Sequence, residues 1–178
     1  VTNCSNMFNS CSSLQSITLP ELPAVTNCSS MFSGCSSLQS VTLPSLQAVT
    51  SCANMFNSCT SLQSLYLDMP NCENFSNSFY RCNALHTLEI VDVRKATSLS
   101  NSFNFCSSLK NVTCVEELPK CAISFIFSSK LTLDSITNII THLPTVEVGK
   151  TLSLHGDVKK LLTDELIAQA TSKNWTIA

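Results

Sequence analysis

Apolar positions recur along most of the chain with a period close to two dozen residues. The clearest marker is a cysteine followed three residues later by a leucine. This pair occurs five times: Cys11/Leu14, Cys35/Leu38, Cys59/Leu62, Cys82/Leu85 and Cys106/Leu109. The steps between successive cysteines are 24, 24, 23 and 24 residues, so a single deletion near Asp68 accounts for the short step. A fixed period of this length indicates a repeat architecture.

Each unit continues with apolar residues at the third and fifth positions after the leucine, as in Leu14-x-x-Ile17-x-Leu19. Successive side chains of a strand point to opposite faces, so Ile17 and Leu19 are predicted to point inward and Thr18 outward. A proline follows directly in the first two units (Pro20 and Pro44), where a turn begins and a missing N–H costs little. The pattern predicts one short strand per unit.

Leu-x-x-Leu-x-Leu is the signature of a leucine-rich repeat, whose units bury their apolar edges only against one another. Strands stacked at ~4.8 Å form a parallel sheet, and the inward residues merge into one core. The sequence therefore predicts a leucine-rich-repeat solenoid, a right-handed β/α superhelix with short parallel β-strands on its concave face. Residues 1–130 are predicted to hold about five units, and Val1 falls in mid-unit, which suggests that the N-terminal part of the repeats is missing.

The last part of the chain follows a different pattern. Four apolar residues at helical spacing follow Asp134, a candidate N-cap: Ile136, Ile139, Ile140 and Leu143. Thr151–Leu154 is predicted as a strand, and Thr163 as the start of a second helix. The terminal repeat of a solenoid needs an end that does not expose a raw apolar face. Residues 131–178 are therefore predicted to be a small α/β C-terminal cap.

The eleven cysteines are best explained as core residues. Most cysteine positions hold other residues in other units. The position of Cys28, for example, is taken by Phe75 and Leu99 in later units. Phenylalanine cannot replace a metal ligand or half of a disulfide, so cysteine serves there as an ordinary small apolar residue. One position is cysteine in every unit: Cys11, Cys35, Cys59, Cys82 and Cys106. Neighbouring rungs lie within disulfide range, so some oxidation of this ladder stays open. Eleven thiols cannot all pair, and Cys-x6-Cys is unlike the spacing of zinc sites, so free core thiols are favoured over disulfides or a metal site.

The unit MFSGCSSLQSVTLPSLQAVT resembles the BspA-like leucine-rich repeat of bacterial surface proteins, and five copies in register carry the resemblance through residues 1–121. The family resemblance implies a bacterial cell-surface or secreted location and a role in adhesion, matrix binding or host interaction. It brings no catalytic motif, no cofactor and no ligand-binding residue that transfers position by position. The tail, with LTLDSITNIITHL, KTLSL and LTDELIAQATSKNWTIA, is similar to the ends of gut-bacterial surface repeat proteins.

Charge narrows the possible partners. Only 12% of residues are charged, and all ten Lys and Arg lie at or after Arg81. Because the surface of the repeats is nearly neutral, it cannot bind nucleic acid by counterion release. It also offers no basic patch for anionic lipid. No apolar run approaches the ~20 residues of a transmembrane helix.

The outward residues of the predicted strands are the usual binding surface of such a solenoid. The first two units are small and neutral there, whereas later units introduce Tyr66, His86 and Glu89, with Tyr80 and Arg81 on an adjoining loop. These five residues are the predicted ligand patch, although drift on a solvated surface would produce the same differences. The three histidines are scattered and no nucleophile accompanies them, so the sequence predicts no catalytic residue, no metal site and no cofactor.

These observations favour a non-enzymatic module that binds a host protein or another surface protein through its concave sheet. The alternative is a glycan-binding module, because Tyr66 on a hydroxyl- and amide-rich sheet offers a ring on which a sugar can stack. A hydrolase is disfavoured.

Overall fold

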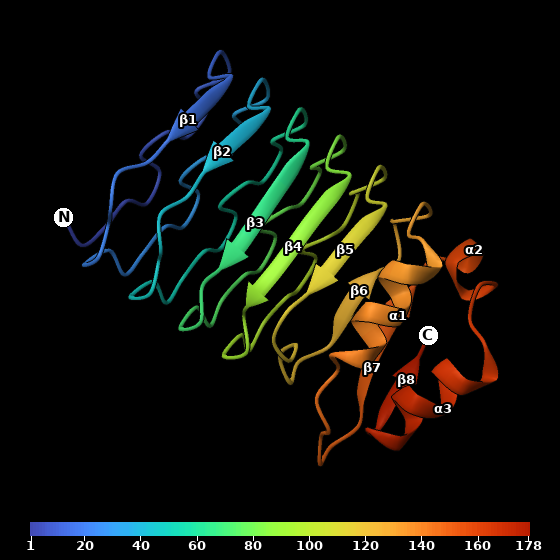
Figure 1. Cartoon of the computed structure of the whole chain (residues 1–178). Helices are drawn as coiled ribbons and strands as arrows, with labels where there is room; N and C mark the ends of the chain where they lie inside the picture. The colour runs from blue at the N-terminus through green and yellow to red at the C-terminus, as the bar shows by residue number, and fades with distance from the viewer.

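A ladder of five short parallel strands crosses one face of an elongated stack of rungs (Figure 1). The structure is a computed structural model that describes residues 1–178. The strands are β1 (Ser16–Thr18), β2 (Ser40–Thr42), β3 (Ser64–Asp68), β4 (Thr87–Asp92) and β5 (Asn111–Cys114). β1 pairs with β2, and β3, β4 and β5 form a second parallel sheet, with the predicted register between equivalent positions. The predicted leucine-rich-repeat fold is confirmed.

Alternation within the strands separates the core from the solvent-exposed sheet face, as expected for a period of two. In β3, Leu65 and Leu67 are buried whereas Ser64 and Tyr66 are exposed. In β4, Leu88 and Ile90 are buried and Glu89 is exposed. The inward residues of all rungs join one continuous apolar cluster that extends into the C-terminal segment.

The opposite face of the stack is organised by a column of phenylalanine rings, one from each rung. Neighbouring rings are stacked with centroids 4.7–6.0 Å apart: Phe8, Phe32, Phe56, Phe79, Phe103 and Phe125. Main-chain bonds tie the same segments together, for example from the Phe32 N–H to the Met55 carbonyl (2.9 Å). Each rung is thus fixed to the next by hydrogen bonds on both faces of the stack.

Two residues in each rung adopt left-handed backbone conformations on either side of the phenylalanine. The first position lies two residues before the phenylalanine and holds asparagine or serine: Asn6, Ser30, Asn54, Asn77 and Asn101. The second holds Ser10, Gly34, Ser58, Arg81 and Phe105. Asparagine and glycine tolerate this region well, whereas a bulky side chain there is unusual. Asparagine at four of the five first positions therefore suits the backbone conformation of the turn.

All eleven cysteines are free thiols, and nine of them are buried; Cys11 is exposed and Cys121 half-buried. The thiols of the ladder donate to the phenylalanine carbonyl of the preceding rung, at 3.0–3.2 Å: Cys35 to Phe8, Cys59 to Phe32, Cys82 to Phe56 and Cys106 to Phe79. A small side chain that is apolar and also a weak donor fits this position. Nine of the eleven cysteines lie in the core, as the sequence predicts, whereas the exposed Cys11 and the half-buried Cys121 do not.

We expect thiol titration to separate these environments. Under denaturing, non-reducing conditions all eleven thiols should react with a disulfide reagent, because none is bonded to another. In the native protein Cys11 should react first and the nine buried thiols should not react until the stack opens. Fewer than eleven reactive thiols after unfolding would show that part of the ladder is oxidised.

The rung after β5 keeps the phenylalanine column but replaces the strand with a helix. β6 (Ile123–Phe125) places Phe125 on Phe103, and α1 (Leu133–Thr141) then lies beside β5. The free N–H groups of β5 are taken up by this helix, because Ser135 Oγ accepts from Val112 N (2.9 Å) and Asn138 Oδ1 accepts from Cys114 N (2.6 Å). α1 therefore covers the edge of β5, which would otherwise be free to pair with a strand of another chain.

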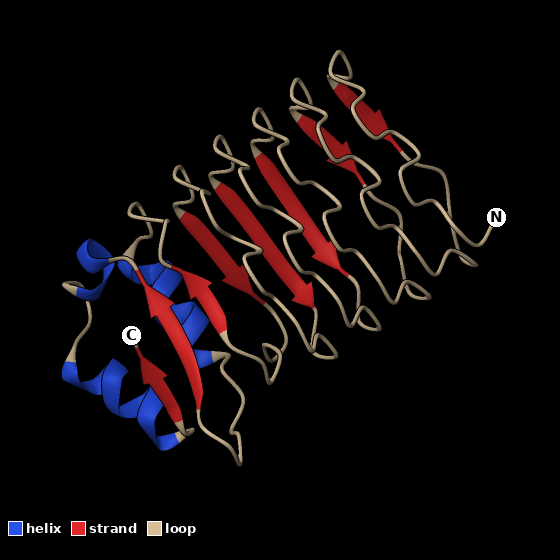
Figure 2. Ribbon diagram, turned by 180° about the vertical axis from the view of Figure 1, so that it is seen from behind, coloured by secondary structure: helices blue, strands red, loops and turns tan.

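The remaining C-terminal elements complete a third parallel sheet, which is backed by helices. They are β7 (Lys150–Leu154), α2 (Gly156–Lys159), α3 (Asp164–Ser172) and β8 (Trp175–Ile177). The order is β6-β7-β8, and β6 carries Phe125 of the phenylalanine column. Figure 2, which views the molecule from behind, shows this sheet in front of the helices. None of the three helices has the length and apolar character needed to cross a bilayer.

The helix starts agree with the sequence in one case and differ in the other. Thr163 is the N-cap of α3, as predicted, with its hydroxyl accepting from Leu166 N. Asp134 is not an N-cap; Thr132 caps α1 and its hydroxyl accepts from Ser135 N. The main chain of Thr132 is held to Lys110 of the preceding rung, which fixes the point where the helix begins. The division into repeats to residue 130 and a cap from residue 131 stays a prediction.

Candidate functional site

Tyr66 and Glu89 are neighbours on the exposed face of the sheet, and we call this pair the sheet patch. Tyr66 lies on β3 with 53% of its surface exposed, directly in register with Glu89 of β4. Glu89 is in turn in register with Thr113 of β5. The rest of this face is small and polar, so the tyrosine ring stands above its surroundings.

A hollow of about 170 Å³ lies next to Tyr66, towards the end of β3. It is lined by Leu43, Pro44, Ser45, Tyr66, Asp68 and Met69. The Asp68 carboxylate is partly desolvated and lies near the Asp92 carboxylate, and both effects raise the pKa of Asp68. Its one side-chain hydrogen bond is a long one from Gln47 Nε2 (3.5 Å). The hollow thus combines a ring, a proline and a weakly satisfied acceptor.

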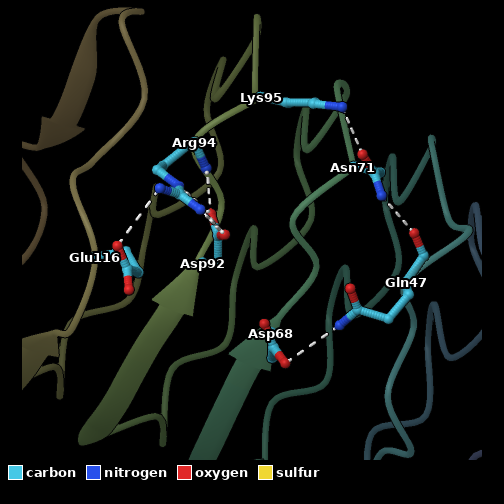
Figure 3. A network of polar contacts seen from close by, with 7 residues as sticks. All are labelled: Gln47, Asp68, Asn71, Asp92, Arg94, Lys95 and Glu116. Atoms are coloured by element: carbon cyan, nitrogen blue, oxygen red, sulfur yellow. Dashed lines mark hydrogen bonds and ion pairs between the residues drawn. The ribbon is translucent and has the colours of Figure 1, made fainter.

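Asp92, the residue paired with Asp68 in the sheet, has a different environment (Figure 3). Its carboxylate accepts from the Arg94 backbone N–H (3.0 Å) and pairs with the Arg94 guanidinium (2.8 Å). Burial alone would raise the pKa of Asp92, but the hydrogen bonds and charge of Arg94 lower it. Arg94 also approaches Glu116 at 3.5 Å. The Asp92 carboxylate is thus engaged by Arg94, whereas the Asp68 carboxylate can still accept hydrogen bonds from a ligand.

His86 lies just before β4, away from Glu89. Its ring nitrogen Nδ1 is 3.0 Å from the Thr87 hydroxyl, and its main chain bonds to Gln63 and Lys110 on the two adjoining rungs. Three residues along a strand correspond to about 10 Å, so His86 and Glu89 do not form a histidine–carboxylate pair. His86 marks the beginning of the sheet face on which the sheet patch lies.

Tyr80 and Arg81 lie in a separate cluster, on the turns that precede the strands. Both contact Phe105 of the next rung, and Phe105 in turn contacts Phe127 of the rung after it; neither phenylalanine is among the residues predicted from the sequence. The Tyr80 and Phe105 rings meet edge to face at 5.4 Å, and Phe105 stacks on Phe127 at 4.4 Å. The structure therefore divides the five predicted residues into two groups. An internal comparison would have revealed Phe105, because equivalent positions in earlier units are Ser10, Gly34 and Ser58.

Neither group has the composition of a metal centre. The structure contains no cluster of three or more His, Cys, Asp or Glu side chains able to hold an ion. His142 and His155 act at helix ends: His142 follows α1, and the His155 ring accepts from Asp157 N at the start of α2. The arrangement provides a shaped surface with a few polar anchors.

A stack of parallel-strand rungs with an open, polar sheet face defines a leucine-rich-repeat protein, a class that generally serves as a binding scaffold. The chain belongs to the BspA type leucine rich repeat region family, whose model matches six copies over residues 3–94 and 53–146. Among solved structures it is similar to the leucine rich repeat protein of T. pallidum, with 18% identity and a TM-score of 0.66 over 100% of this chain and 79% of that chain. This similarity supports the fold alone. No curated protein matches the sequence significantly.

Proposed function

We propose that this chain is a non-enzymatic interaction module of a bacterial cell-surface or secreted protein. It binds a host protein or another surface protein through the sheet face of β1–β5. The proposal is supported by membership of a family typically associated with bacterial surfaces. The observation that carries it is the exposed Tyr66 aligned with Glu89 on an otherwise small, neutral sheet.

The chemistry of the sheet face suits protein recognition. Exposed serine, threonine and glutamine side chains lose little solvation on contact, since each can exchange a water for a hydrogen bond from the partner. Tyrosine adds a large, stiff contact surface with a polar tip and is enriched among the residues that dominate binding energy. A partner seated on this face would take Tyr66 as its central contact and Glu89 as a charged one.

A glycan is the second candidate ligand, because of the hollow beside Tyr66. Sugar recognition commonly joins an aromatic ring to carboxylate and amide groups that hydrogen-bond hydroxyls, and Tyr66, Asp68 and Gln47 provide these three kinds of group. A protein ligand would use the whole sheet, whereas a sugar would depend on Asp68 as strongly as on Tyr66.

Replacing Tyr66 by threonine, the residue at the same position of β1 and β2, should weaken ligand binding about tenfold, as expected for a central aromatic contact. The measurement is surface plasmon resonance against a panel of immobilised extracellular-matrix and serum proteins, with a glycan array in parallel. Thr42→Ala, at the equivalent position of β2, is the matched control and should weaken binding much less, because it removes only a small peripheral side chain.

Three outcomes separate the candidates. Loss of protein binding in Tyr66→Thr but not in Asp68→Asn supports the interaction module. Loss of glycan binding in both variants supports the sugar site. Unchanged binding in Tyr66→Thr to every ligand of the wild type would remove the sheet patch from the function.

A further inference from the structure

The turns that precede β4, β5 and α1 carry a second surface distinct from the sheet patch. Two columns of residues follow the stacked phenylalanines, and in the first three rungs they are small and polar: Asn9, Ser33, Asn57 in one column and Ser10, Gly34, Ser58 in the other. In the next three rungs five of the six positions are large: Tyr80, Arg81, Phe105, Ile126 and Phe127. We call these five residues the turn patch.

Backbone conformation argues that the turn patch is more than drift. Phe105 has φ 63°, a left-handed conformation that is unfavourable for a bulky side chain, at a position where serine or glycine serves the first three rungs. The residue is nevertheless 39% exposed, as is Phe127, and Ile126 is 47% exposed. The strained position therefore holds an aromatic ring in solvent where the fold alone would accept serine.

The turn patch has a defined internal geometry. Phe105 and Phe127 are stacked with an interplanar angle of 24°, and Tyr80 meets Phe105 at 82°. The Arg81 guanidinium lies 5.6 Å from the Tyr80 ring centroid and 5.9 Å from that of Phe105. These cation–π contacts hold the guanidinium beside the rings. Arg81 forms no salt bridge, so its charge is available to a ligand.

Charge and ring orientation identify the kind of ligand. Residues 76–84, 100–108 and 123–132 include Arg81 and Lys130 and contain no Asp or Glu. Phe105 stacks on Phe127 and meets Tyr80 edge to face, so the patch is an exposed apolar surface of packed rings beside one cation. A carboxylate beside apolar side chains complements such a patch: the acid pairs with Arg81 and the apolar groups cover the rings.

We propose that the turn patch docks a segment of another protein in which an aspartate or glutamate lies next to leucine, isoleucine or phenylalanine. The site is at the edge where the strands begin, the upper edge of the ladder in Figure 1. It extends the proposed function to a second surface and does not depend on the sheet patch.

The test uses a printed array of random-sequence peptides of roughly twelve residues, probed with the purified chain. Wild type should select peptides with an acidic residue adjacent to apolar ones. Phe105→Ser together with Phe127→Ser should lower binding to those peptides about tenfold, and Arg81→Ser should remove the acidic preference. Serine is the residue that earlier rungs use at this position, so these variants suit the backbone. Leu161→Ser with Ile167→Ser, equally exposed on the C-terminal segment, is the control and should bind normally.

Tyr66→Thr distinguishes this surface from the sheet patch, since it should leave the selected peptides unchanged. The proposal is overturned if no peptide binds above background, or if the selected set carries no acidic preference. It also fails if light scattering shows a dimer that Phe105→Ser dissociates, which would assign the patch to a second copy. Binding of wild type, but not of the double serine variant, to anionic phosphatidylserine vesicles in place of peptides would assign it to a membrane.

Discussion

Phe56→Ala will lower the free energy of unfolding by about 3–5 kcal/mol, the range measured for removing a buried phenylalanine. The ring is fully buried and lies between Phe32 and Phe79, with centroids 5.3 and 6.0 Å away. Its removal leaves a cavity and breaks the column on both sides. In a stack where each rung contacts only its neighbours, stability is a sum of rung and interface terms, so two interfaces weaken together.

Urea denaturation followed by circular dichroism measures the loss from the shift of the midpoint. Ile167→Ala, on the exposed surface of α3, is the control and should change stability by no more than about 0.5 kcal/mol. A loss below about 1 kcal/mol for Phe56→Ala would mean that the rungs move together to fill the cavity, and that the phenylalanine column contributes little to the stack.

The repeated features of this fold could be predicted because each occurs several times in the sequence. Leucine, cysteine and phenylalanine recur at fixed positions, so their alignment between rungs follows from the period alone. The interchange of Cys28 with Phe75 and Leu99 was enough to favour core thiols over bridges. The carbonyl partner of each ladder thiol could not be predicted, because it depends on how far one rung is displaced along the next.

Features that occur only once in the chain were harder to predict. The helical spacing after Asp134 indicates α1, but nothing local says that Ser135 and Asn138 would take up the N–H groups of β5. Two buried serines are similar: Ser78 donates to the Cys52 carbonyl (2.7 Å) and Ser102 to the Phe75 carbonyl (2.6 Å), in positions where earlier rungs have methionine. Only the assembled stack provides these acceptors.

Only part of the candidate site could be predicted from the sequence, for the same reason. Tyr66, His86 and Glu89 stand out because the strand pattern predicts which residues face outward. Tyr80 and Arg81 were grouped with them, yet the structure unites these two with Phe105 and Phe127. Phe127 follows Phe105 by 22 residues instead of 24, in the rung where a helix replaces the strand, so the period no longer aligns it. Because the repeat is interrupted in this rung, the period alone does not show that Phe127 belongs to the turn patch.

Alkaline pH should unfold the protein, because its buried thiols can ionise only in the unfolded chain. Burial raises the pKa of Cys59, Cys106 and Cys114 from 9.0 to about 12. Above pH 9 the unfolded chain loses these protons while the folded chain keeps them, so the free energy of unfolding falls with rising pH. Each thiol contributes up to about 1.4 kcal/mol per pH unit, and three together about 4 kcal/mol per unit. A domain of ordinary stability, about 5 kcal/mol or more, is then expected to unfold only above roughly pH 10.

Urea midpoints measured in a phosphine reductant from pH 7 to 10.5 should therefore be constant up to about pH 8.5 and then fall steeply. The control is Cys59→Ala, which leaves a small cavity but has no proton to lose. Its stability at pH 7 should be lower than that of the wild type, and its decline above pH 9 shallower by about 1.4 kcal/mol per unit. Equal slopes for the two proteins would show that the Cys59 thiol ionises as readily inside the stack as in water, which a thiol packed against the Phe32 carbonyl should not do.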